Sequence, residues 1–174
     1  SREDSEGKTF GEELKRINWI GDEEVGSRKM KAFFALHIEQ GPILELEEKE
    51  IGVVTHGQGL SWLEITLTGK ESHTGSTPMP MRVNAGLGMA RITQLVDEIA
   101  NNYEPNAVGA IGQCDIYPNS RNIIPGKAVF TVDFRHPEKS IITSMEEELR
   151  LGAEKIAKEI GLTLEIESVG GFDA

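Results

Sequence analysis

From residue 60 onward, apolar side chains follow two spacings that alternate along the chain, and this pattern restricts the fold more than any other feature. Leu63, Ile65 and Leu67 alternate with polar residues, which is typical of a half-buried strand. The same two-residue period returns over residues 130–134 and 162–166. Because this period places successive side chains on opposite faces, we expect a sheet with one buried face and one open face.

Two helices are predicted between these strands. From Arg82 to about Asn101, apolar residues recur three and four positions apart, which predicts one apolar helix face. A second run with this spacing begins near Ser140, a candidate N-cap, and Gly161 is well placed to end it.

A weaker strand is expected over residues 108–116, with Ala110, Gly112 and Cys114 as its inward-facing residues. The resulting order is strand, helix, strand, strand, helix, strand. That order predicts an α/β (α+β) domain of the ferredoxin-like split βαββαβ type. It indicates little about function, because many unrelated activities use this fold.

The first 57 residues lack this regularity. A short surface helix is expected near Leu14 and Ile17 within the polar residues 1–30. The compact apolar run 31–37 predicts a buried strand, and residues 51–55 predict another. Between them, a short helix is expected with Pro42 near its first turn.

Composition excludes several classes of protein. The net charge of −11, from 29 Asp and Glu against 18 Lys and Arg, argues against nucleic acid as a partner. No apolar run reaches the ~18–20 residues that a membrane span needs. The single cysteine, Cys114, excludes a disulfide framework and is expected in the core. With a hydrophilic start and no signal-peptide core, the expected localisation is cytoplasmic.

Two of the four histidines are candidates for chemistry. His37 ends the apolar run 31–37 and is either a metal ligand or a buried structural histidine, since neutral imidazole is the commonest protein ligand for metals. One histidine makes no site alone, and no HExxH motif accompanies it. His73 lies in a polar loop with two prolines, which is otherwise an ordinary surface loop. His56 and His136 are interpreted as structural.

Asn122 and Arg135 are further candidates. Asn122 lies in a turn between two strands, where turn chemistry alone also explains an asparagine. Arg135 ends a strand on its polar side, where it can hold a substrate carboxylate in bidentate fashion or pair with Asp133. No nucleotide-binding loop and no GxSxG nucleophile elbow is present in the sequence.

Six motifs, taken in order, carry a family resemblance, and one of them is Trp-Leu-Glu at 62–64. The other five are Leu-His-Ile-Glu-Gln-Gly-Pro-Ile-Leu-Glu at 36–45, Ile-Gly-Val-Val at 51–54, Ser-His-Thr-Gly-Ser-Thr-Pro-Met at 72–79, Asn-Ile-Ile-Pro-Gly at 122–126 and Asp-Phe-Arg at 133–135. Together they resemble the hydantoinase/carbamoylase-type amidohydrolases of the M20 metallopeptidase group. That family includes N-carbamoyl-L-amino acid hydrolases, allantoate amidohydrolases and β-ureidopropionases. The resemblance extends over nearly the whole chain.

The resemblance implies a division into domains. Residues 1–57 correspond to part of a catalytic α/β domain, residues 58–170 to an inserted lid and dimerisation domain, and residues 171–174 to the return of the chain. The chain is then a fragment whose parent is a homodimer with two divalent metal ions, zinc, manganese or cobalt. The fragment by itself need not bind metal and is expected to be inactive. Five residues would pack into the missing catalytic domain and are expected to form an exposed apolar patch here: Phe33, Phe34, Leu36, Val53 and Val54.

The resemblance also implies roles for five residues. His37 would be a metal ligand, and Gln40 would touch the substrate. His73 and Asn122 would donate hydrogen bonds near the scissile carbonyl, where a developing oxyanion needs donors. Arg135 would hold the substrate carboxylate.

The implied reaction is hydrolysis of a linear C–N bond in N-carbamoyl-L-amino acids or similar ureido acids, a small-molecule substrate class. Two alternatives remain: an M20-type aminoacylase or dipeptidase, and a non-catalytic dimerisation or binding module.

The predicted topology separates these residues. The loops with His73 and Asn122 follow two strands that run the same way, so both lie at one end of the sheet. Arg135 ends a returning strand at the opposite end, about 25 Å away at ~3.4 Å per residue. We therefore predict that one site uses His73 and Asn122 of one subunit with Arg135 of the other.

Overall fold

The computed structural model describes residues 3–4, 6–55 and 57–173, so His56 lies outside the described residues. The chain divides into two units, residues 1–52 and residues 53–174. Each unit is described by itself. The domain boundaries predicted after residues 57 and 170 stay predictions.

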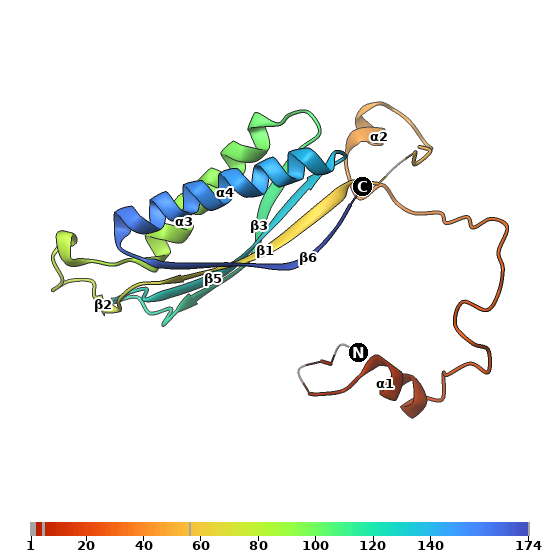
Figure 1. Ribbon diagram of the computed structural model, residues 1–174, viewed down its shortest axis with the longest axis horizontal. Coiled ribbons are helices and arrows are strands. Elements are labelled where there is room, and N and C mark those ends of the chain that lie inside the picture. Colours follow the sequence, from red (N-terminus) through yellow and green to blue (C-terminus); the bar gives the residue numbers. More distant parts are fainter. Residues whose placement is uncertain (1–2, 5, 56, 174) are drawn as a thin grey trace. The chain divides into compact units, whose positions relative to one another are not determined.

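Residues 53–174 form a four-stranded antiparallel sheet covered on one face by two helices (Figure 1). The strands lie in the order β3-β5-β1-β6, with β1 and β5 in the centre. The predicted order of strands and helices is confirmed. The elements are β1 (Gly59–Thr68), α3 (Ala85–Asn102), β3 (Val108–Tyr117), β5 (Lys127–His136), α4 (Lys139–Ile160) and β6 (Thr163–Phe172).

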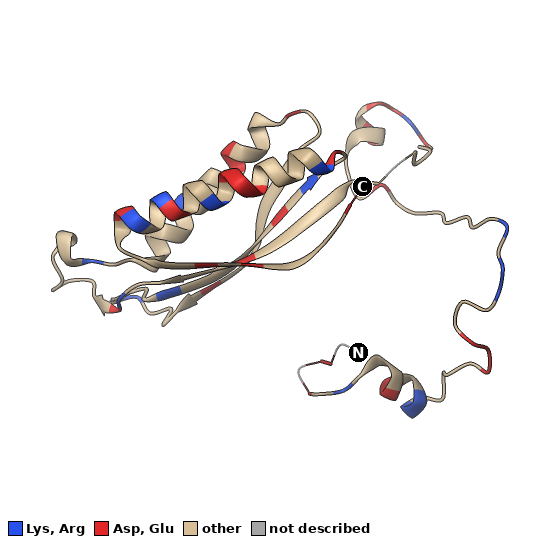
Figure 2. Cartoon of the chain, in the orientation of Figure 1, with Lys and Arg blue, Asp and Glu red and all other residues tan. Residues whose placement is uncertain are grey.

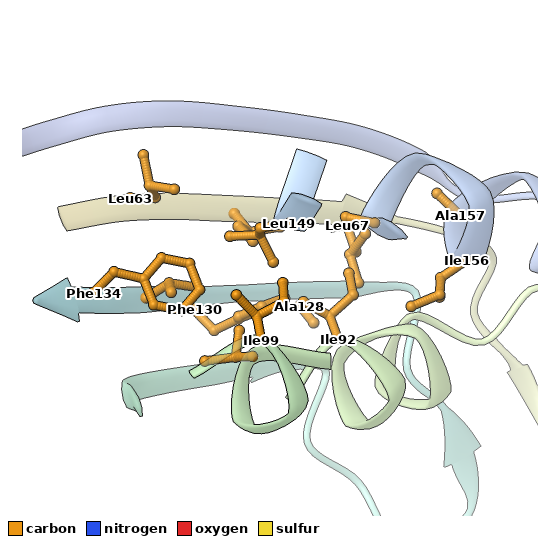
Figure 3. Close-up of a cluster of buried hydrophobic side chains, with 14 of the residues drawn as sticks. Leu63, Leu67, Ile92, Ile99, Ala128, Phe130, Phe134, Leu149, Ile156 and Ala157 are labelled. Carbon is orange, nitrogen blue, oxygen red and sulfur yellow. The ribbon is translucent and has the colours of Figure 1, made fainter. Parts of the chain in front are cut away.

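The core lies between the sheet and the helices α3 and α4. Inward side chains of β1 and β5 meet the apolar faces of both helices, as Figure 3 shows for Leu63, Phe130, Ile92 and Leu149. Alternation along the strands and the three-and-four spacing along the helices are therefore confirmed. The fully buried strand residues are Leu63, Ile65, Leu67, Ala128, Phe130, Val132 and Phe134.

The inward-facing residues predicted for β3 are wrong. Ala110, Gly112 and Cys114 are exposed, whereas Gly109 faces the core, where a Cβ atom would lie 2.8 Å from the Phe134 ring. A register shift between Ile111 and Cys114 interrupts the pairing of β3 with β5. An irregularity of this kind changes which side chains face the core, and β3 is also an edge strand that the helices cover incompletely.

The ends of the two helices match the sequence in part. Asn84 caps α3 by accepting a hydrogen bond from the Leu87 N–H at 3.2 Å. Ser140 is not the cap of α4, because the helix already begins at Lys139. Instead the Glu138 N–H donates to Nδ1 of the buried His136 at 2.9 Å. Gly161 ends α4 with a positive φ of 84°, as predicted.

Residues 1–52 bury none of their large apolar side chains. This unit contains two short helices, α1 (Phe10–Arg16) and α2 (Ile43–Leu46). The strands predicted over residues 31–37 and 51–55 are not formed, and Phe34 and Leu36 are fully exposed. A strand needs neighbours to bond its backbone, and neither run pairs with another strand among the described residues.

Charges of both signs are interspersed over the surface of α4 (Figure 2). One of them, Glu159, pairs with Arg91 of α3 at 2.7 Å, so the two helices are also linked at their solvent side. Within the part of the chain that the structure describes, no helix is both long and apolar enough to cross a membrane.

Candidate functional site

A second, two-stranded sheet joins the loops that carry His73 and Asn122. It consists of β2 (Ser72–His73) and β4 (Ile123–Ile124), and His73 lies directly opposite Ile123. The Thr74 N–H donates to the Asn122 carbonyl at 3.0 Å. The loops that follow β1 and β3 therefore lie together, at what we call the loop end of the main sheet.

Close backbone contacts fix the loop end. The Gly69 N–H donates to the Gly126 carbonyl at 2.7 Å. A Cβ atom on Gly126 would lie 2.8 Å from the Glu71 backbone nitrogen, so only glycine fits without a shift of the chain. The glycines at positions 69 and 126 therefore allow the backbones of the two loops to approach this closely.

The His73 ring is held by its own loop. Its Nδ1 atom accepts hydrogen bonds from the backbone N–H groups of Gly75 at 3.0 Å and Ser76 at 3.2 Å. The residue is exposed, so the rest of the ring is accessible.

Asn122 is also held in one orientation. The Ser120 hydroxyl donates to Asn122 Oδ1 at 3.0 Å, so this oxygen is already engaged. The exposed Asn122 side chain therefore offers its Nδ2–H groups as donors. His73 and Asn122 together give the loop end two side chains suited to an oxygen that gains negative charge.

Arg135 lies at the other end of the sheet. In the β1–β5 register, Leu60 pairs with Arg135 whereas Thr68 pairs with Lys127, at the loop end. Eight residues of strand separate these positions, or about 27 Å. The structure thus does not bring Arg135 together with His73 and Asn122 within one chain.

Arg135 forms a bidentate ion pair with Asp133. Its Nε lies 3.0 Å from Asp133 Oδ1, and its Nη2 lies 2.8 Å from Oδ2. Partial burial raises the pKa of Asp133, but hydrogen bonds from Arg135 and Trp62 outweigh it and hold this pKa below its ordinary value. The same pair raises the pKa of Arg135.

This pairing leaves one edge of the guanidinium open. Asp133 engages the Nε–Nη2 edge, and Nη1 has no partner among the described residues. An arginine presents donors on two edges, so a second carboxylate can bind beside Asp133. The pairing with Asp133 was one of the two alternatives for Arg135, and the open edge leaves room for the other.

Trp62 is a neighbour of this pair that stands in one of the family motifs, although no role was predicted for it. Trp62 lies opposite Asp133 on the open face of the sheet and lines a hollow of about 280 Å³. In the sequence, Trp62 stands at an outward position of an alternating strand, and a large aromatic residue at such a position indicates a contact on the open face. The hollow is lined by Trp62, Gly112, Thr131, Val132, Asp133 and Val169.

The segment with His37 and Gln40 has its own local order in residues 1–52. Glu39 accepts hydrogen bonds from the N–H groups of Ile43 at 3.2 Å and Leu44 at 3.0 Å, at the start of α2. Gln40 turns the chain with a left-handed φ of 56°, a conformation that favours glycine. The role of Glu39 as a helix cap was not predicted.

His37 has the geometry of an available ligand, but it belongs to no cluster of potential metal ligands among the described residues. Its Nδ1 lies 2.5 Å from the Ile38 carbonyl oxygen. A carbonyl only accepts, so Nδ1 carries the proton and Nε2 keeps its lone pair. Among the described residues, no group of three or more His, Cys, Asp or Glu side chains is arranged to hold a metal ion.

Comparisons with known proteins identify the family of the chain. Residues 55–161 match the family model of the peptidase dimerisation domain. The chain is 60% identical over 173 residues to an N-carbamoyl-L-amino-acid amidohydrolase of Rhizobium meliloti, covering 99% of this chain and 42% of the relative. It is 31% identical over 166 residues to allantoate amidohydrolase of Escherichia coli K12, covering 94% of this chain and 40% of that protein.

A solved structure leads to the same family. The crystal structure of a hydantoinase/carbamoylase family amidase from Burkholderia vietnamiensis superposes with a TM-score of 0.88 and 50% identity, covering 99% of this chain and 42% of that one. The chain therefore spans about two fifths of the length of the relatives it matches. On the family model, the motifs and the fold, this chain belongs to the M20 peptidase dimerisation-domain family, among its hydantoinase/carbamoylase-type members.

Proposed function

We propose that the chain is the lid and dimerisation domain, with an adjoining strip of catalytic domain, of an amidohydrolase that cleaves N-carbamoyl-L-amino acids or similar ureido acids. The observation that carries the proposal is the pair of oriented donors, His73 and Asn122, at one end of the sheet and the half-open guanidinium of Arg135 at the other. A ureido acid offers one group for each: a carbonyl and a free carboxylate.

Arg135 recognises the substrate carboxylate through its open edge. A planar guanidinium matches a carboxylate better than a point charge does, and Asp133 keeps the plane fixed. Trp62 and its hollow lie beside this pair. Gln40, held in a sharp turn, is a further substrate contact.

His73 and Asn122 stabilise the oxygen of the attacked carbonyl. Both offer N–H donors whose other polar atom is already engaged, so little reorganisation is needed when negative charge develops. Donors of this kind stabilise the transition state more than the ground state, and they therefore raise kcat.

His37 fits one ligand of a divalent cation, because its Nε2 lone pair is free. A bound cation supplies polarisation of the carbonyl and activation of water. The remaining ligands would come from outside the described residues of this chain. Imidazole with carboxylate ligands suits zinc, manganese or cobalt.

The separation of the two ends supports a site shared between two subunits. His73 and Asn122 of one subunit would share one site with Arg135 of its partner. A homodimer with twofold symmetry then carries two equivalent composite sites.

The test uses the complete protein encoded by the reading frame that contains this chain. We expect hydrolysis of N-carbamoyl-L-amino acids in the presence of Zn²⁺, Mn²⁺ or Co²⁺, and loss of a metal equivalent in His37→Ala. Preferential cleavage of dipeptides or N-acyl amino acids would replace the proposal with an aminoacylase or dipeptidase. A complete protein with no hydrolase activity would favour a binding module.

A mixing experiment tests the shared site. The variants His73→Asn and Arg135→Met should each have a strongly reduced activity alone. Mixed dimers restore one intact site in two, so random mixing should recover about one quarter of the wild-type activity. A site built within one subunit would recover none.

A further inference from the structure

The loop that carries His73 has no core of its own. None of the residues 71–82 is buried, so apolar packing does not fix the conformation of this loop. At its base, the Lys70 N–H donates to the Val83 carbonyl at 2.9 Å, which brings the two ends of the loop together just before α3. Between these ends, the conformation depends on the hydrogen bonds that the backbone groups of the loop make.

The N–H groups of the turn at 73–77 bond to His73. Gly75 and Ser76 donate to its Nδ1 atom at 3.0 and 3.2 Å, and the Thr77 N–H donates to its carbonyl at 3.2 Å. These bonds hold the ring against the turn, but they all lie within the loop. They leave open what holds the turn itself.

Arg82 supplies the donors for the two carbonyls of this turn. No backbone N–H among the described residues donates to the carbonyl of Thr74 or Thr77. Arg82 Nη2 donates to the Thr74 carbonyl at 2.6 Å, and Arg82 Nε donates to the Thr77 carbonyl at 3.0 Å. Although the chain has 29 Asp and Glu residues, this half-buried guanidinium forms no ion pair within the described part of the chain. The Arg82 side chain is therefore committed to the backbone of the loop.

We propose that Arg82 is a positioning residue of the active site, which acts through the loop and not on the substrate. It fixes the turn that holds the His73 ring. Through Thr74, whose N–H donates to the Asn122 carbonyl at 3.0 Å, it also fixes the distance between the two loops. That both side chains serve one ureido carbonyl rests on the proposed function, whereas the dependence of the loop on Arg82 does not.

The geometry explains why this position needs an arginine. Nε and Nη2 are two donors on one edge of a rigid plane, so a single side chain can hold two carbonyls that lie three residues apart. A lysine has one nitrogen on a flexible stem and cannot reproduce this edge. Because Thr74 and Thr77 are only half-buried, water can replace the lost donors. Loss of Arg82 should therefore change the position of the loop more than the stability of the fold.

The first test measures kinetics of the complete protein. In Arg82→Met we expect kcat for an N-carbamoyl-L-amino acid to fall about 10–100-fold, because small displacements of a positioned group are costly. KM should change little, since Arg135 still binds the carboxylate. Arg82→Lys should lie between the two proteins. Arg91→Met, which removes the ion pair with Glu159 between the helices, is the matched control and should keep the wild-type kcat.

Two kinetic results would overturn the proposal. A wild-type kcat in Arg82→Met would mean that the loop needs no such support. Full activity of Arg82→Lys would mean that a positive charge or one bond is sufficient, which excludes the hold on two carbonyls.

Mixed dimers separate positioning from a folding defect. Arg82→Met and Arg135→Met lie in different halves of the shared site, so their random mixture should recover about one quarter of the wild-type activity. Arg82→Met and His73→Asn lie in the same half, so their mixture should recover none. A subunit that cannot fold would restore neither mixture. Failure of Arg82→Met to recover with Arg135→Met, where His73→Asn does recover, would overturn the assignment.

Amide hydrogen exchange tests the loop independently of activity. In the 174-residue chain, we expect the N–H groups of Gly75, Ser76 and Thr77 to exchange about tenfold faster in Arg82→Met than in wild type, with β5 unchanged. Arg91→Met should leave all of them unchanged. Equal exchange in Arg82→Met and wild type overturns the proposal, whatever the activity. Faster exchange in a complete protein that hydrolyses no ureido acid upholds the role of Arg82 in the loop and rejects the proposed function.

Discussion

Residues 1–52 and residues 53–174 both contain compact runs of apolar residues, but only the second unit buries them. Phe130 and Phe134 are fully buried between the sheet and two helices, whereas Phe33 and Phe34 are 81% and 92% exposed. The difference is not one of hydrophobicity. Strands β1 and β5 have neighbours on both sides, and the run 31–37 has none among the described residues. Burial therefore depends on partners, and an apolar run predicts only the need for one.

The first prediction compares the stability that a buried and an exposed phenylalanine contribute in the two units. Phe130→Ala leaves a cavity in the core and should lower the free energy of unfolding by about 3–5 kcal/mol. Phe34→Ala removes an exposed side chain and should change it by less than about 0.5 kcal/mol. Urea denaturation of the 174-residue chain measures both. Comparable losses in the two variants would mean that residues 31–37 are packed in solution.

The second prediction concerns the loop end. Gly126→Ala places a Cβ 2.8 Å from the Glu71 nitrogen, and the resulting shift should cost about 1–3 kcal/mol of unfolding free energy. It should also displace Asn122 from His73 and lower kcat of the complete protein. Gly112→Ala is the matched control, because its added Cβ meets only the Thr131 hydroxyl at 3.8 Å. If the two variants behave alike, the close approach of the loops is not required.

The third prediction uses the pH dependence of the Arg135–Asp133 pair. The pKa of Asp133 is lowered in the folded state, so the pair stabilises the fold above the ordinary carboxyl pKa of about 3.9. This contribution, up to about 1 kcal/mol, is lost as pH falls through the lowered folded-state pKa. Wild type should therefore exceed Asp133→Asn in stability at pH 6, and the gap should close in strong acid.

Asp115→Asn provides the control for this pH series. Asp115 accepts a hydrogen bond from the Gln113 side chain at 2.9 Å and has no arginine partner among the described residues. Its substitution should produce a smaller gap at pH 6. A gap for Asp133→Asn that widens toward low pH would contradict the stated pairing.

The fourth prediction concerns deletion of residues 1–52, the unit without a buried core among its described residues. Because all buried apolar side chains among the described residues lie within 60–162, deletion of residues 1–52 should change the unfolding free energy of the remainder by less than about 0.5 kcal/mol. Limited proteolysis of the whole chain should cut within residues 20–42 before it cuts the sheet. Resistance of residues 20–42 to protease would show that this unit has a packed structure of its own in solution.

The sequence predicted the elements of residues 53–174 well, because each of them has a strong period. Phe130, Val132 and Phe134 repeat every two residues, and Ile92, Val96 and Ile99 repeat every three or four, so their faces follow from geometry alone. Edge strand β3 was mispredicted on its inward side, because a register shift leaves no trace in a pattern of small residues. The start of α4 was misplaced because the helix begins at Lys139 without a side-chain cap, and the N–H of its N-cap residue Glu138 bonds to the His136 side chain.

The sequence motifs identified the candidate residues, whereas the structure showed how their side chains are arranged. His37, Gln40, His73, Asn122 and Arg135 stand in segments that resemble a known family, and the order of the strands alone predicts that Arg135 lies far from His73. Trp62 and Arg82 were missed as partners, since neither belongs to a pattern that specifies what its side chain will touch. Their contacts cross between strands or return to loop carbonyls five and eight residues away.

By itself, the sequence determined the periodic elements, the family and the residue types available for chemistry, because these depend on local spacing and composition. Only the tertiary structure decided which polar atom of each residue remains available. Asp133 occupies one edge of Arg135, Ser120 occupies the oxygen of Asn122, and the loop occupies Nδ1 of His73. These contacts depend on backbone directions in three dimensions, and a linear pattern does not specify them.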